Sequence, residues 1–137
     1  MWKLYAILSA VFASLTDVFA KMGVKNIDSN LATGIRTIVI LLLICGIVWA
    51  TGSYSGLKNI TPRNYAFLII SGIMTGLSWL FYFKAIQVGE LSKVAPIDKL
   101  SVVLTIIFGL LLFHEKLTLQ TALGGLLVTG GIYVLLL

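Results

Sequence analysis

The sequence predicts an all-α integral membrane protein with five transmembrane helices. Of its 137 residues, 59% are hydrophobic and only 11% are charged, whereas soluble domains carry about 25% charged and about 45–50% apolar residues. The mean hydropathy is +1.06. A helix that crosses a hydrocarbon core about 30 Å thick needs about 20 mainly apolar residues, and five such stretches follow one another along the chain. Residues 1–137 are therefore expected to form a single transmembrane domain without a soluble one.

The first two spans are separated by a polar turn. Lys3 to Gly23 is the first span, and we interpret it as an uncleaved helix, although its basic start followed by apolar residues is also typical of a signal peptide. Residues 25–30 contain helix breakers and helix starters. The second span then runs from Leu31 to Thr51.

Short connections also delimit the remaining three spans. The stretch Gly52 to Pro62 precedes the third span, Asn64 to Gln87. Gly89 and Glu90 precede the fourth, Leu91 to Phe113, and His114 to Lys116 precede the fifth, Thr118 to Leu137. All of these connections are too short to fold as a second domain.

The fourth span is expected to bend near Pro96. The 14 uncharged residues Leu100 to Phe113 make about 21 Å of helix, so Asp98 and Lys99 must enter the membrane to complete a span. The ring of Pro96 removes a backbone donor, and irregular backbone at that depth needs protein or water around it. A bent helix lining a cavity is one interpretation. A proline in the first turn, with Lys93 and Lys99 snorkelling outward, is the other.

An odd number of spans places the two termini on opposite sides of the membrane. An excess of Lys and Arg in short loops normally sets orientation, but here the two sides are balanced, which permits insertion both ways and hence an antiparallel homodimer. The alternative is a fixed orientation set by one or two residues, since two lysines can be counted as intramembrane. The basic residues are Lys3, Lys58, Arg63 and Lys116 on one side, and Lys21, Lys25, Lys84 and Lys93 on the other.

A polar stripe runs along the first span, where Ser9, Ala13, Asp17 and Lys21 recur every four residues. An acidic side chain inside a span costs about 2.5–3.5 kcal/mol on insertion scales, so it usually faces a bundle interior and marks an ion, proton or substrate path. Asp17 is therefore a candidate ion site, or else a member of a structural ion pair that holds helices together, and it could pair directly with Lys21. Lys21 either joins this path or snorkels from the helix end.

Charged residues from four spans are expected at similar depth, in the half of the bilayer opposite the N-terminus. Such convergence predicts a polar pocket, with an excess of positive charge that favours an anionic or zwitterionic metabolite. Ser78 and Tyr82 lie on one face of the third span, and Trp79 beside them faces either the pocket or lipid. The charged residues are Asp17, Lys21, Arg36, Lys84, Asp98 and Lys99.

Small residues recur at spacings that let helices approach closely. Gly72 and Gly76 form a GxxxG pair, and Gly125 lies in a small-xxx-small series. We interpret these glycines as packing positions. The chain has one histidine, one cysteine and no phosphate-binding glycine loop, and its basic residues are scattered singly. No enzyme activity, metal, cofactor or nucleic-acid partner is therefore expected.

Two segments carry a family resemblance: Phe81 to Leu100, with the sequence FYFKAIQVGELSKVAPIDKL, and the turn Phe113 to Thr118, FHEKLT. Together with Lys21 and Arg36 they resemble the EamA family of the drug/metabolite transporter superfamily, in particular its small five-helix members. The resemblance covers nearly the whole chain. The chain differs from the family's usual pattern in two respects. Most members carry two five-helix repeats in one chain, and many have a proline at the position of Ser101 and Val102.

The resemblance implies secondary-active transport or export of a small metabolite or drug-like molecule across the cytoplasmic membrane. Secondary transporters commonly form their site between inverted repeats, and a single five-helix repeat would recreate that arrangement as an antiparallel homodimer with alternating access. On this hypothesis Asp17 is the proton or cation site, and Arg36, Lys84 and Trp79 contact the substrate. Cation/proton antiport is a second transport hypothesis. A structural or regulatory subunit that packs through its GxxxG face is the alternative outside transport.

Overall fold

All five expected spans are helical in the structure, a computed structural model that describes residues 1–137. The helix ends lie within two residues of the predicted ends, and the fourth span, Leu91–Leu112, consists of two helices. Five helical segments are long and apolar enough to cross a membrane, which confirms the all-helical fold class. The elements are α1 (Trp2–Gly23), α2 (Ser29–Ala50), the 3₁₀ helix η1 (Ser53–Asn59), α3 (Pro62–Val88), α4 (Leu91–Asp98), α5 (Leu100–Leu112) and α6 (Leu119–Leu136).

Local residues set both ends of α2. At its start, the carboxylate of Asp28 accepts hydrogen bonds from the backbone N–H groups of Asn30 and Leu31, at 2.9 and 3.1 Å, and so satisfies donors that a helix start leaves unpaired. At its end, Gly52 has φ +68°, a left-handed conformation that glycine adopts readily. Its N–H donates to the carbonyl of Trp49 at 3.1 Å, which closes the helix end.

The fourth span is interrupted at Lys99. Pro96 lies inside α4, and the N–H of Lys99 donates to the carbonyl of Pro96, only three residues back, at 3.0 Å. The N–H of Val102 likewise donates to the carbonyl of Lys99 at 2.9 Å. These shorter loops are 3₁₀ hydrogen bonds, which replace the α-helical pattern and separate α4 from α5. The interruption thus lies three residues beyond the proline.

The chain forms two compact units, Met1–Gln87 and Val88–Leu137. Unit 1 contains α1, α2, η1 and nearly all of α3, and unit 2 contains α4, α5 and α6. In unit 2, α6 contacts both α4 and α5. The Ile106 side chain of α5 lies 3.5 Å from the point where a Cβ would stand on Gly125 of α6, so this glycine lets the two helices approach closely.

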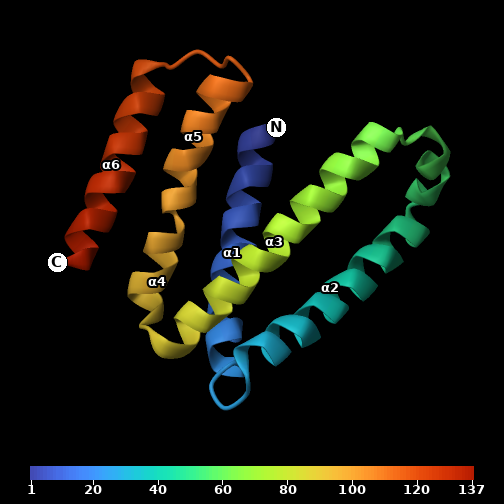
Figure 1. The fold of residues 1–137 in the computed structure, drawn as a ribbon, viewed down its shortest axis with the longest axis horizontal. Coiled ribbons are helices and arrows are strands. Elements are labelled where there is room, and N and C mark those ends of the chain that lie inside the picture. The colour runs from blue at the N-terminus through green and yellow to red at the C-terminus, as the bar shows by residue number, and fades with distance from the viewer. The chain divides into compact units, whose positions relative to one another are not determined.

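The buried residues of unit 1 gather at one end of its helices. This closed end comprises the end of α1, the start of α2 and the end of α3. From there α1 and α2 diverge along their length (Figure 1). Unit 1 is therefore closed around the α1–α2 loop and open toward the chain's N-terminus. The buried side chains are Val24, Ser29, Ala32, Thr33, Phe83 and Ile86.

Candidate substrate site in unit 1

Three side-chain hydrogen bonds hold the end of α1 and the α1–α2 loop against the end of α3. The Nε2 of Gln87 donates to the carbonyls of Val24 at 3.1 Å and Ile27 at 2.7 Å. The ammonium of Lys21 donates to the carbonyl of Ile86. Val24 and Ile86 are only 1% and 0% exposed, so these bonds lie beside a well-packed contact. They fix the closed end of unit 1 and thereby the positions of the side chains next to it.

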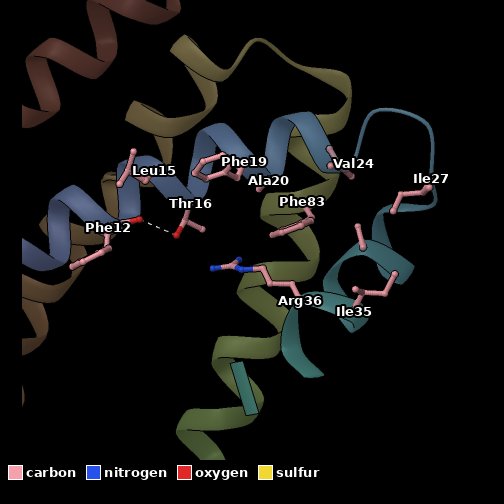
Figure 2. A pocket seen from close by; sticks show the side chains of 12 residues that line it. Phe12, Leu15, Thr16, Phe19, Ala20, Val24, Ile27, Ile35, Arg36 and Phe83 are labelled. Carbon is pink, nitrogen blue, oxygen red and sulfur yellow. Dashed lines mark hydrogen bonds between the residues drawn. The ribbon is translucent and has the colours of Figure 1, made fainter. Parts of the chain in front are cut away.

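A cavity of about 610 Å³ adjoins the closed end, with walls from all three long helices (Figure 2). Small-molecule sites typically have volumes of about 300–1,000 Å³, so this cavity has the size of a ligand site. It is open on one side, where Phe12 and Phe19 are 66% and 68% exposed. Only Thr16 and Arg36 bring polar side chains to its wall. The Thr16 hydroxyl already donates its proton to the Phe12 carbonyl, at 2.8 Å. The apolar part of the wall includes Phe12, Leu15 and Phe19 of α1, Ile35 of α2 and Phe83 of α3.

Arg36 carries the only charge on the cavity wall. Its side chain extends from α2 toward α1 (Figure 2). The guanidinium carbon lies 4.4 Å from the ring centre of Trp79 and 5.3 Å from that of Phe83, within the range of cation–π interactions. A guanidinium has five N–H donors, yet Arg36 forms no hydrogen bond or salt bridge within the chain. Its donors therefore remain available to a ligand.

Asp17 and Tyr82 complete the electrostatic surroundings of Arg36. Both lie close enough to act on the guanidinium through space. Asp17 is half-buried and forms no salt bridge, because the salt bridges of the chain join Lys93 to Glu90 and Lys99 to Asp98. The direct Asp17–Lys21 pair that the sequence allowed is therefore not formed, and the negative charge of Asp17 acts on Arg36 without direct contact.

The predicted site residues of α3 fall into two sets. Trp79 and Tyr82 are half-buried and share one helix face with the buried Phe83, because positions three and four residues apart lie on the same face. Ser78 and Lys84 are exposed and do not line the cavity. The inward face of α3 is therefore mainly aromatic, whereas the sequence pattern suggested a polar one.

The other predicted residues do not line the cavity. Nothing lies within 4 Å of the point where a Cβ would stand on Gly72 or Gly76, so the GxxxG pair has no packing partner within unit 1. Lys21 lines a second cavity, of about 440 Å³, together with Lys25. Asp98 belongs to unit 2, where its carboxylate accepts a hydrogen bond from Lys99 at 3.3 Å.

Sequence reasoning missed Gln87 and the phenylalanines of the cavity wall. A signal for Gln87 was present, since it is a polar side chain in the last turn of a span, where a loop can lie beside it. The phenylalanines give no such signal, because a cavity wall and a lipid-facing surface are both apolar. The structure contains no group of three or more His, Cys, Asp and Glu side chains placed to hold a metal ion.

Comparisons with known proteins agree with the resemblance seen in the sequence. An uncharacterized transporter in the cobO 3′ region of Sinorhizobium sp. is 49% identical over 134 residues, which are 98% of this chain and 95% of that protein. The uncharacterized transporter YvbV of Bacillus subtilis (strain 168) is 33% identical over 131 residues. These are 94% of this chain but only 42% of YvbV, so the chain spans less than half of that relative.

No solved structure is significantly similar to the chain. The model of the EamA-like transporter family matches residues 1–137, and both relatives are named as transporters. Together with the five apolar spans, these matches indicate a membrane protein with a general role in transport. The chain belongs to the EamA-like transporter family.

Proposed function

We propose that the protein carries out secondary-active transport or export of a small anionic or zwitterionic metabolite across the cytoplasmic membrane, with the cavity around Arg36 as its substrate site. One observation carries this proposal: a half-buried guanidinium lies over Trp79 and Phe83 on an apolar wall, and none of its donors has an acceptor in the chain. A charged group removed from water without a partner is unfavourable. A bound anion would supply charge-assisted hydrogen bonds at this position.

We further propose that two antiparallel copies form the transport path. An odd number of spans would leave the termini on opposite sides, and the matched segment makes up 42% of YvbV, which leaves room in that protein for a second segment of similar length. A second, inverted copy would take the place of such a segment, as in transporters built from inverted repeats. The open face at Gly72 and Gly76 offers a surface for close helix approach.

In this mechanism Asp17 is the proton or cation site, and it acts through Arg36. While its carboxylate is charged, it competes electrostatically with an anionic substrate for the guanidinium. Protonation removes that competition, so proton binding and anion binding would strengthen each other by the same factor. A site that holds both the proton and the anion would have a net charge closer to zero than a site that holds only one of them. Rocking of one copy against the other would expose the site to the two sides in turn.

The first experiment measures the thermal stability of the purified protein against amines, amino acids, organic acids, sugars and nucleosides at two pH values. A ligand that binds the folded state raises its stability by about 2.7 kcal/mol at one hundred times its dissociation constant. A stabilising ligand is then tested for uptake into proteoliposomes under a pH gradient. We expect pH-dependent uptake that is lost in Asp17→Asn and kept in Glu90→Gln, which neutralises an exposed carboxylate elsewhere. Unchanged pH dependence in Asp17→Asn would exclude Asp17 as the coupling site.

The antiparallel arrangement is tested by labelling single cysteines from outside the cell. Cys45 is the only cysteine, so a Cys45→Ser protein can carry Asn26→Cys in the α1–α2 loop or Ser55→Cys in η1, which lie at opposite ends of α2. A membrane-impermeant maleimide is expected to label each variant in about half of the molecules, because both orientations are present. Labelling of one variant alone would show a fixed orientation.

A non-transporting membrane subunit is the second candidate function, and the open face at Gly72 and Gly76 favours it. Large side chains there, as in Gly72→Leu with Gly76→Leu, block close helix approach. Loss of a complex with another membrane protein in this variant, with no solute taken up by the wild type, would support the subunit hypothesis over transport.

A further inference from the structure

We infer that the cavity around Arg36 selects organic monoanions, that is, molecules with one carboxylate on an apolar or aromatic body. The inference rests on the proposed function and names the substrate class for the same site. It follows from three features: the number of charges that the cavity can balance, the edge of the guanidinium, and the chemistry of the remaining wall.

The charge count allows one anionic group. Arg36 is the only cation on the wall, Lys21 already donates to the Ile86 carbonyl, and Lys84 is exposed on another face of α3. A second carboxylate on the ligand would find no cation, and Asp17, which acts on Arg36 through space, would repel it. A cationic ligand would be repelled by Arg36, the only charged residue on the wall. A neutral ligand would leave the guanidinium as unpaired as it is without a ligand.

The aromatic contacts of Arg36 prepare it for a carboxylate. Cation–π interactions use the face of a guanidinium, whereas its N–H donors point outward in the plane and match the two oxygens of a carboxylate. Trp79 and Phe83 can therefore hold the side chain in place while its edge binds the anion. A donor group that is already held in position loses less conformational entropy when a ligand binds.

The rest of the wall favours an apolar body. Apart from Arg36 and the internally bonded Thr16, the cavity is lined by apolar residues, with three phenylalanines among them. A volume of about 610 Å³ is much larger than a carboxylate alone needs, so burial of an attached ring or chain adds to the affinity. Phenylalanine side chains also interact favourably with a flat aromatic ligand.

The test uses the fluorescence of Trp79, which lies beneath Arg36. Trp2 and Trp49 are 73% and 79% exposed, so a Trp2→Phe, Trp49→Phe protein keeps Trp79 as its only tryptophan. The probes share one phenyl group and differ in charge: 3-phenylpropanoate, 3-phenylpropanamide, 3-phenylpropylamine and the dianion phenylsuccinate. Acetate supplies the carboxylate without the body.

We expect a saturable change with 3-phenylpropanoate, at an affinity about tenfold or more above that of each other probe, because hydrogen bonds between charged groups are the stronger ones. Arg36→Gln should remove this preference, and Arg36→Lys should weaken it, since lysine keeps the charge but lacks the planar edge. Arg63→Gln is the matched control, because Arg63 also lies over a ring, 5.7 Å from Phe67, but away from the cavity. It should bind like the parent protein.

Three outcomes would overturn the inference: no response to 3-phenylpropanoate, equal or tighter binding of the amide, amine or dianion, or a preference for the acid that survives in a folded Arg36→Gln protein. Circular dichroism identifies the folded variants, and Arg36→Lys serves if Arg36→Gln does not fold. Selective acid binding without uptake into proteoliposomes would support the ligand class and contradict transport. Uptake of an amine without acid binding would support transport and contradict the ligand class.

Discussion

Replacement of Gln87 by leucine is expected to loosen the closed end of unit 1. Leucine has a similar size but no donor, so the carbonyls of Val24 and Ile27 would both lose their partner. The two losses are unequal. Val24 is 1% exposed and its carbonyl has little access to water, whereas Ile27 is 39% exposed and water can replace the lost donor there.

The magnitude follows from the environments of these two bonds. A hydrogen bond contributes about 0.5–1.5 kcal/mol net to stability. With the upper value for the bond to Val24 and the lower value for the bond to Ile27, Gln87→Leu should reduce the free energy of unfolding by about 2 kcal/mol. This corresponds to a decrease of about 30-fold in the folding equilibrium constant.

The assay is reversible unfolding of the Trp2→Phe, Trp49→Phe protein in mixed micelles with an increasing fraction of SDS, followed by Trp79 fluorescence and circular dichroism. Gln120→Leu is the control, because it makes the same chemical change at an exposed position of α6 whose side chain forms no hydrogen bond. Equal losses in the two variants, or a loss below about 0.5 kcal/mol for Gln87→Leu, would refute the reasoning.

Three further substitutions test the remaining local contacts in the same assay. Asp28→Ala should destabilise the protein by about 1 kcal/mol, because the first turn of α2 loses its acceptor. Gly52→Ala should destabilise it by about 1–2 kcal/mol, since a residue with a Cβ is strained at φ +68°. Gly109→Ala should leave the stability unchanged or raise it by up to about 1 kcal/mol, the helix preference of alanine over glycine. Its Cβ would meet the Glu115 carboxylate at 2.8 Å, and that exposed group can rotate away.

The controls for these substitutions come from the same segments. Asn26→Ala changes an exposed loop residue without side-chain hydrogen bonds and should leave the unfolding free energy nearly unchanged. A loss in Asn26→Ala as large as that in Asp28→Ala would show that the cap does not stabilise α2. A Gly109→Ala protein destabilised as strongly as Gly52→Ala would show that Glu115 is held firmly over α5.

The spans and their ends could be predicted because both depend on local sequence. Each span needs about 20 apolar residues, and polar residues such as Asp28 mark where a helix begins. The interruption of the fourth span was predictable only in outline. The missing N–H of Pro96 creates the irregularity, but the tight hydrogen bonds that end α4 form at Lys99, where the backbone turns.

The lining of the candidate site was predictable only in part, because lipid and protein interior are both apolar. Arg36, Asp17 and Trp79 were recognisable in the sequence. Charged side chains are rare inside a span, and tryptophan is usually found at the membrane–water interface. The rotation of α3 about its own axis, which decides which face points inward, was not recognisable from the sequence. No hydrophobic difference turns one face of a helix inward in a membrane, so the stripe that includes Ser78 gave no guide to the inward position of Phe83.

The closed end of unit 1 is the point about which α1 and α2 would tilt. α1 has 22 residues, which make about 33 Å of helix. A tilt of 10° about the closed end would therefore move the far end of α1 by about 6 Å. Arg36 lies seven residues from the start of α2, so the same tilt would move it by only about 2 Å. The far end of α1 would thus move about three times as far as Arg36, so any opening of unit 1 is widest away from the candidate site.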